Sequence, residues 1–125
     1  MPTTYRDPQA VRQAILDSIS HWERMASNPD STEKPLADDC PLCRYFDSSH
    51  YYCSSLTEER CPIAVISTQT LCINTPYIKA HSLWIHKDEN PGNTEAFEKW
   101  QKAAQKEIAF LKDVLKKFDL HNPLP

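Results

Sequence analysis

The sequence has 125 residues, of which 40% are hydrophobic and 25% charged, with a net charge of −3. This length suits one domain, and the composition is that of a globular protein. The negative charge argues against nucleic acid as the main partner. Because the chain has neither an apolar run of about 18 residues nor the apolar start of a signal peptide, we expect no membrane contact and a cytoplasmic location.

The first predicted helix begins near Asp7-Pro8 and ends before Asn28-Pro29. Asp7 can cap the first free backbone amides, and Pro8 suits the first helical position because its missing N–H is not needed there. Apolar residues recur every three or four positions, which predicts one face packed on the core. They are Val11, Ile15, Ile19, Trp22 and Met25 or Ala26.

A cysteine-rich segment follows a polar loop. Its five cysteines are Cys40, Cys43, Cys53, Cys61 and Cys72. In a reducing cytoplasm, clustered cysteines bind metal more often than they form disulfides, and an odd number is awkward for disulfide pairing. The C-x-x-C turn at Cys40 and Cys43 places two thiolates on one side of a bend, where both can hold zinc. Since zinc takes four ligands, the others must come from Cys53, Cys61, Cys72 or His50.

Two further helices are predicted after the cysteines. Thr75-Pro76 predicts the start of a helix that reaches about Lys87, with Tyr77, Ala80 and Trp84 on one side. Residues 88–93, DENPGN, predict a turn. The last helix is predicted from about Thr94 to Phe118. Its apolar stripe is Phe97, Trp100, Ala104, Ile108, Leu111, Leu115 and Phe118.

The outer face of the last helix carries opposite charges four residues apart. The pairs are Glu95–Lys99, Glu98–Lys102 and Asp113–Lys117, each with the acid first. This pattern is typical of a solvated scaffold face. The predicted fold is therefore mostly α: a single domain, residues 1–125, of three main helices. An irregular, zinc-stapled, cysteine-rich segment at about residues 40–72 lies between the first and second helices.

Four short motifs resemble those of a loose set of small, uncharacterised bacteriophage and prophage proteins. Those proteins share an HW pair, C-x-L-C, C-x-x-C-P and C-x-x-T-P-Y. The matches are His21-Trp22, Cys40-Pro41-Leu42-Cys43, Cys61-Pro62 and Cys72-Ile73-Asn74-Thr75-Pro76-Tyr77. Glu58 stands where the partner of Cys61 would be, and Cys53 lies five residues earlier, as though the turn were lengthened. The resemblance implies a metal site on a helical protein, and it implies no activity.

On these grounds we expect one structural zinc ion, held by Cys40, Cys43, Cys61 and Cys53, with Cys72 or His50 as the alternative to Cys53. Neither H-E-x-x-H nor the zinc deaminase signature is present, and one glycine cannot form a phosphate-binding loop. We therefore expect a binding protein and not an enzyme. A metal-dependent or cysteine enzyme is the third interpretation.

The partner expected from the phage resemblance is a bacterial host protein, which the chain would inhibit or recruit in the host cytoplasm. A component of host defence is the favoured target within that class. Aromatic side chains anchor protein interfaces, and four of them lie close together in the cysteine-rich segment. The expected contact residues are Tyr45, Phe46, Tyr51 and Tyr52.

The alternative partner is a small anionic or nucleotide-like ligand. Aromatic, histidine and arginine side chains suit such a ligand. The expected cleft would be lined by His21, Arg44, Tyr77, His81 and Trp84. The competing interpretation of His21 is structural: a histidine at the edge of the core stripe that bonds to a backbone carbonyl.

Protein purified without chelator should contain about one zinc ion per chain, because four thiolates complete a tetrahedral site. Elemental analysis measures this directly, and protein without stoichiometric metal would contradict it.

Zinc binding to such ligands contributes roughly 10–16 kcal/mol in peptides, against about 5–15 kcal/mol of stability for a whole domain. Chelation should therefore lower the melting temperature and the ellipticity, whereas unchanged values after confirmed removal of the metal would refute a structural role.

Overall fold

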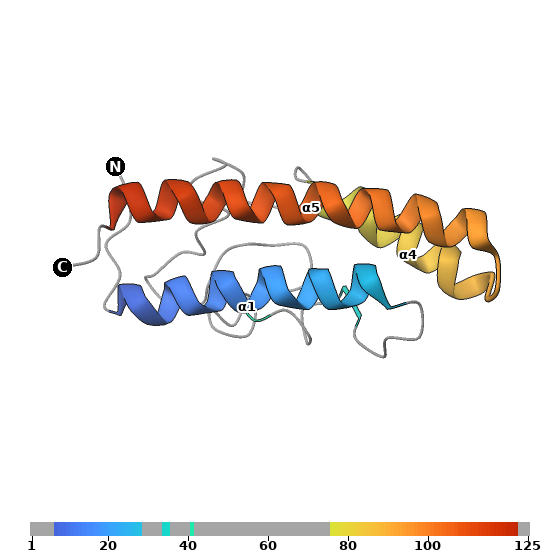
Figure 1. The fold of residues 1–125 in the computed structure, drawn as a ribbon, viewed down its shortest axis with the longest axis horizontal. Coiled ribbons are helices and arrows are strands. Elements are labelled where there is room, and N and C mark those ends of the chain that lie inside the picture. Colours follow the sequence, from blue (N-terminus) through green and yellow to red (C-terminus); the bar gives the residue numbers. More distant parts are fainter. Residues whose placement is uncertain (1–6, 29–33, 36–40, 42–75, 123–125) are drawn as a thin grey trace.

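The computed structural model describes residues 7–28, 34–35, 41 and 76–122. This part of the chain holds three helices, α1 (Pro8–Ser27), α4 (Tyr77–Glu89) and α5 (Thr94–His121), and contains no strand (Figure 1). The prediction of a mostly α protein with three packed helices is confirmed. The cysteine-rich segment predicted at about residues 40–72 lies outside the described residues, apart from position 41.

Helix α1 has the predicted bounds and the predicted cap. The side chain of Asp7 accepts a hydrogen bond from the backbone N–H of Ala10 at 3.1 Å, and Pro8 occupies the first helical position. The helix ends at Ser27 because Asn28 adopts extended backbone angles. The apolar stripe expected along α1 is buried throughout, and it supplies one side of the core.

Helices α4 and α5 each run slightly further than predicted. Helix α4 ends at Glu89, two residues beyond Lys87, and the Asn90 N–H closes its last turn on the carbonyl of Lys87 at 3.1 Å. A tight turn follows, in which Gly92 has a φ of 82°, a conformation that favours glycine. Asn93 then caps α5 by accepting from the N–H of Ala96 at 3.0 Å.

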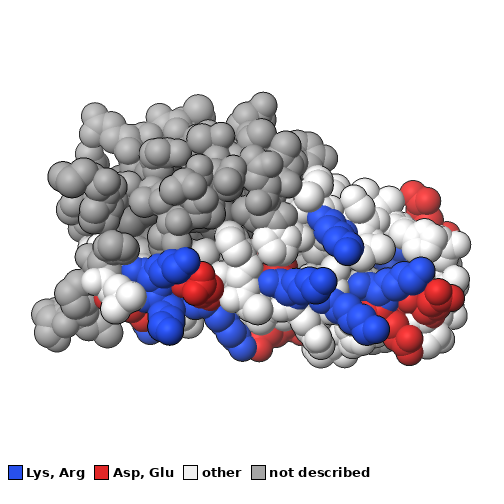
Figure 2. Space-filling view, turned by 90° about the horizontal axis from the view of Figure 1, so that it is seen from above, with Lys and Arg blue, Asp and Glu red and all other residues white. Residues whose placement is uncertain are grey.

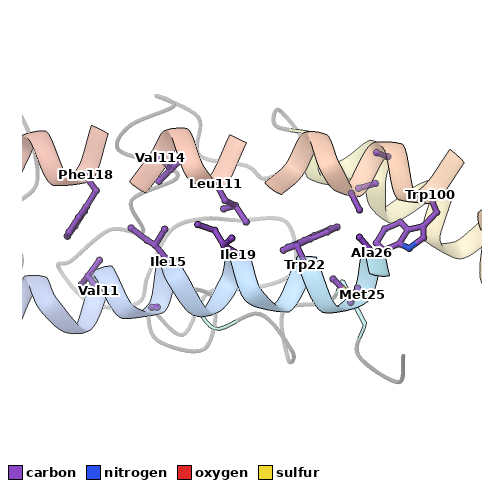
Figure 3. Close-up of a cluster of buried hydrophobic side chains, with 14 residues drawn as sticks. Val11, Ile15, Ile19, Trp22, Met25, Ala26, Trp100, Leu111, Val114 and Phe118 are labelled. Carbon is purple, nitrogen blue, oxygen red and sulfur yellow. The ribbon is translucent and has the colours of Figure 1, made fainter. Parts of the chain in front are cut away.

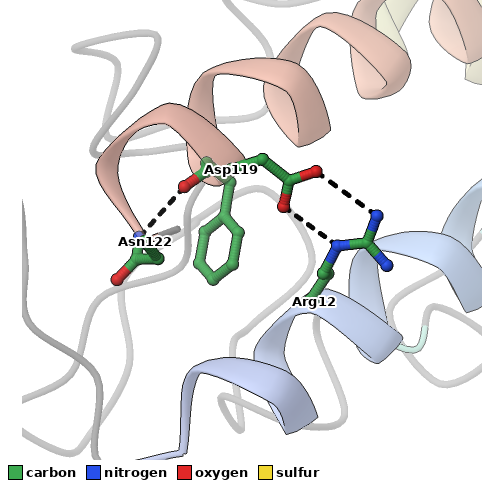
Figure 4. Close-up of polar contacts among 4 residues, drawn as sticks. Arg12, Asp119 and Asn122 are labelled. Carbon is green, nitrogen blue, oxygen red and sulfur yellow. Dashed lines mark hydrogen bonds and ion pairs between the residues drawn. The ribbon is translucent and has the colours of Figure 1, made fainter. Parts of the chain in front are cut away.

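The end of α5 lies three residues beyond the predicted Phe118, at His121. The backbone N–H and the side-chain amide of Asn122 both donate to the carbonyl of Phe118, at 2.8 and 3.2 Å. Asp119, the residue after Phe118, receives two hydrogen bonds from Arg12 on α1 (Figure 4). These contacts hold the extra turn, and only the packed structure provides the bonds from Arg12.

Helix α5 is the element on which the other two pack. Helices α1 and α4 both run antiparallel to it, with α1 along its C-terminal part and α4 beside its N-terminal half (Figure 1). The α1–α5 core extends from Val11 and Phe118 at one end to Ala26 and Trp100 at the other (Figure 3). Alanines at positions 80, 96, 103 and 104 are also buried, which permits close approach of the helices.

Two polar contacts set the antiparallel register of α1 and α5. At one end, Nε and Nη2 of Arg12 donate to Oδ1 and Oδ2 of Asp119 at 2.9 and 3.3 Å. This carboxylate raises the pKa of Arg12 above its ordinary value, first through the hydrogen bond and then through its charge. At the other end, the side-chain amide of Gln101 donates to the carbonyl of Ala26 at 2.8 Å. Because both partners are fixed in sequence, a slip of either helix would break both contacts.

The outer face of α5 forms two of its three predicted ion pairs. Lys99 lies 3.3 Å from Glu95 and Lys117 lies 3.0 Å from Asp113. Glu98 and Lys102 make no such pair among the described residues. Among the described helices, none has the length and apolar character needed to cross a membrane.

Replacing Leu111 with alanine should lower the free energy of unfolding by about 2–5 kcal/mol, because it removes buried methyl groups and leaves a cavity. Leu120→Ala on the same helix is the matched control, since Leu111 is 2% exposed and Leu120 is 74% exposed. The control should stay within about 0.5 kcal/mol of the unchanged protein. Urea denaturation measures both, and equal losses would contradict the packing of α5 described above.

Candidate functional site

All residues of the predicted metal site and partner surface lie outside the described part of the chain. They are Cys40, Cys43, Cys53, Cys61, Cys72 and His50 for the metal, and Tyr45, Phe46, Tyr51 and Tyr52 for the partner. Both sites stay predictions. Within the described ranges alone, no group of three or more His, Cys, Asp or Glu side chains is placed to hold a metal ion.

A cluster of aromatic rings joins the three helices around Trp22. The ring of Trp22 meets that of Tyr77 on α4 edge-on, with centroids 6.1 Å apart, and that of Trp100 on α5 at 5.7 Å. Tyr77 in turn stacks on His81 at 5.7 Å, with nearly parallel planes. His21 lies edge-on to Trp22 at 6.3 Å. These contacts connect three of the five residues predicted for an anion cleft.

The placement of the cluster gives its members different accessibilities. His21 is 1% exposed, so its ring belongs to the protein interior and not to an open surface. Tyr77 and His81 are half-buried, and the hydroxyl of Tyr77 donates to the backbone carbonyl of Pro35, which is buried. Trp84 lies further along α4, where Nζ of Lys87 sits 5.9 Å from its ring centroid. Arg44 lies outside the described residues, so the five-residue cleft stays a prediction.

Two motifs that carry the phage resemblance meet in this cluster. The HW pair supplies His21 and Trp22 from α1, and the T-P-Y motif supplies Tyr77 at the start of α4. Residues 55 positions apart in sequence thus touch through the Trp22–Tyr77 ring contact.

One buried charged residue was missed by the sequence pattern. Glu107 is 3% exposed on α5, although the predicted stripe passed through its neighbour Ile108. The buried positions Ala104, Glu107 and Leu111 follow one another at spacings of three and four, which was the available signal. Burial of an ionisable group is unfavourable without compensating polar contacts, so Glu107 differs in this requirement from the apolar residues of the core.

A groove lined by lysines lies between α4 and α5, and the sequence pattern did not predict it. Its volume is about 280 Å³, and its lining residues are Lys79, Leu83, Lys99, Lys102, Ala103 and Lys106. The view down onto α5 shows Lys and Arg side chains along the described surface, including the half of the molecule that holds α4, with Asp and Glu beside them (Figure 2). The spacing of Lys99, Lys102 and Lys106 places them along one side of α5, but only the packing of α4 brings Lys79 to them.

A second groove lies at the turn between α4 and α5, with a volume of about 390 Å³. Lys87 and Asp88 contribute opposite charges to its lining, together with the turn residues and Phe97. Neither groove is lined by the residues of the predicted anion cleft.

No family model, curated protein or solved structure matches the chain.

Tyr77→Phe should lower the free energy of unfolding by about 1–3 kcal/mol, because the buried Pro35 carbonyl loses its hydrogen-bond donor while the ring is retained. Tyr77→Leu should cost more, since it also removes the ring contacts with Trp22 and His81. Urea denaturation of the three proteins gives both values. A Tyr77→Phe protein as stable as the unchanged chain would show that the hydroxyl does not tie α4 to Pro35.

Proposed function

We propose that this chain is a small, zinc-stabilised accessory protein of phage type that acts by non-covalent binding to a bacterial host protein. Binding would inhibit or recruit that protein, and within this class we propose a component of host defence as the target. The choice of a bacterial partner rests on the motifs shared with phage proteins. The choice of binding over catalysis rests on the distribution of aromatic residues.

The observation that carries the proposal is a group of aromatics that lies outside the three helices in the sequence. The chain has three Trp, five Tyr and four Phe, and seven of these twelve lie on the three helices. Trp22, Trp100 and Phe118 are buried in the helical core, and the other four are partly buried and pack against it. Four of the remaining five aromatics fall within residues 45–52. Such a concentration of Tyr and Phe is typical of an interface anchor.

Zinc would contribute to this function by ordering the contact segment. The four aromatics lie between Cys43 and Cys53, two of the proposed ligands. A metal bound by both cysteines would close this stretch into a loop, and the loop would present its aromatics with little freedom left to lose. Preorganisation of this kind improves affinity because less conformational entropy is lost on binding.

Replacing Tyr51 and Tyr52 together with alanine should weaken binding to the captured partner at least about thirtyfold, since one interface anchor alone contributes about 2 kcal/mol or more. The partner is first isolated from bacterial lysate with the unchanged protein and then titrated, purified, by calorimetry. The matched control is Ile85→Ala with Leu120→Ala, which removes two exposed large apolar side chains from the helices. The control should bind as the unchanged protein does.

Two results would count against the proposal. Equal affinity of the Tyr51 and Tyr52 variant and the unchanged chain, with zinc content intact, would place the interface elsewhere. Turnover of a nucleotide or a peptide by the pure protein would show that the chain is an enzyme.

A further inference from the structure

We propose that the groove between α4 and α5 binds an acidic, amphipathic segment of a partner protein. This inference rests on the proposed function, because it names the chemistry of a partner and adds a second contact surface. It starts from the four lysines that line the groove, Lys79 on α4 and Lys99, Lys102 and Lys106 on α5. Leu83 and the buried Ala103 also line it.

The charges of the groove are poorly neutralised within the protein. Lys99 is paired with Glu95 at 3.3 Å, whereas Lys79, Lys102 and Lys106 make no ion pair among the described residues. Lys102 and Lys106 are four residues apart on one helix, a spacing at which like charges repel. Glu98 is positioned to pair with Lys102 by sequence but does not do so among these residues. Ammonium groups held close together without ion-pair partners among the described residues favour the binding of negatively charged groups.

The groove has an apolar part as well as its charges, and this part restricts the kind of ligand that fits. Leu83, which is only partly buried, offers a contact for an aliphatic side chain, while the ammonium groups that line the groove attract carboxylates. From Lys99 to Lys106 the groove extends about 10 Å along α5, which matches two turns of a bound helix. A helix with acidic residues beside an apolar stripe satisfies both requirements at once, in the way that amphipathic helices fill grooves.

Nucleic acid fits this groove less well. Residues 1–75 hold six basic and ten acidic residues, and residues 76–122 hold eight lysines and seven acidic residues, so the excess of positive charge is local. Residues 76–122 contain no arginine, the side chain that best binds phosphates in pairs. Four ammonium groups over about 10 Å also reach few phosphates of an extended strand.

A small anion fits less well for a different reason. Lys99 is more than half exposed, and a flexible, hydrated ammonium loses side-chain entropy when it is fixed around one ion. A protein segment with several carboxylates spreads this cost over several pairs and adds an apolar contact. The observations therefore favour a protein segment.

The test uses a fluorescein-labelled synthetic peptide of about 14 residues, roughly four helical turns, with Glu on one face and Leu on the other. Fluorescence anisotropy of the full chain with this peptide should give a dissociation constant below about 1 mM. Binding should weaken when salt is raised from about 0.05 to 0.2 M, because exposed charge pairs are screened. The same peptide with Gln for Glu should bind at least about tenfold more weakly, since each exposed pair contributes up to about fivefold.

The groove variant replaces Lys79, Lys102 and Lys106 with glutamine. It should lose peptide affinity on the order of tenfold, a factor of about two to five for each ammonium removed. The matched control replaces Lys112, Lys116 and Lys117 with glutamine, which removes the same charge from the other end of α5. The control should keep its affinity, and circular dichroism should show both variants folded, because Lys and Gln have similar helix propensities.

Several outcomes would overturn the inference. They are no peptide binding, equal losses in the groove and control variants, or tighter binding of a single-stranded DNA oligonucleotide or of inorganic pyrophosphate than of the peptide. The inference and the proposed function fail separately. Absence of peptide binding beside capture of a host protein through Tyr51 and Tyr52 would remove this groove alone. Peptide binding with no host protein captured would remove the proposed function alone.

Discussion

The described structure depends on Trp22 being buried where the three helices meet. Its indole touches Trp100 on α5 and Tyr77 on α4, so one side chain of α1 contacts both other helices. Burial of so large a ring contributes more to the core than any single aliphatic residue, and edge-on contacts between rings add to it. Loss of this contact would leave α4 attached to α5 without its link to α1.

The central position of α5 follows from the same constraint. Among the three described helices, α5 alone packs extensively on both others, and it does so with both large and small buried side chains. Large side chains from Trp100 to Phe118 interdigitate with α1, as Figure 3 shows, while alanines permit close approach of the helices. The polar contacts of Arg12 and Gln101 then fix the register of α1 and α5, because hydrophobic burial alone is not directional.

The lysine-lined groove follows from the packing of α4 on α5, and its lysines give it a positive charge. Helices α4 and α5 are joined by a short turn at Gly92 and must lie antiparallel side by side. That geometry brings Lys79 of α4 and the lysines of α5 to the lining of one groove, together with Leu83. Helices α4 and α5 also carry Tyr77 and Trp100 of the ring cluster, so a partner bound at the groove would contact an element that is joined to α1 through Tyr77.

Local signals in the sequence determined the three helices and most of their ends. The Asp7-Pro8 start and the stripe through Val11, Ile15 and Ile19 were sufficient for α1, because caps and periodic apolar residues act within a few residues of chain. Tertiary contacts decided what lay beyond that range. The last turn of α5 is held in part by the bonds from Arg12, more than one hundred residues away, and the burial of His21 and Glu107 appears only in the folded chain. The groove needed Lys79 and Lys106 to meet across two helices, and a one-dimensional pattern of charges carries no information on such a meeting.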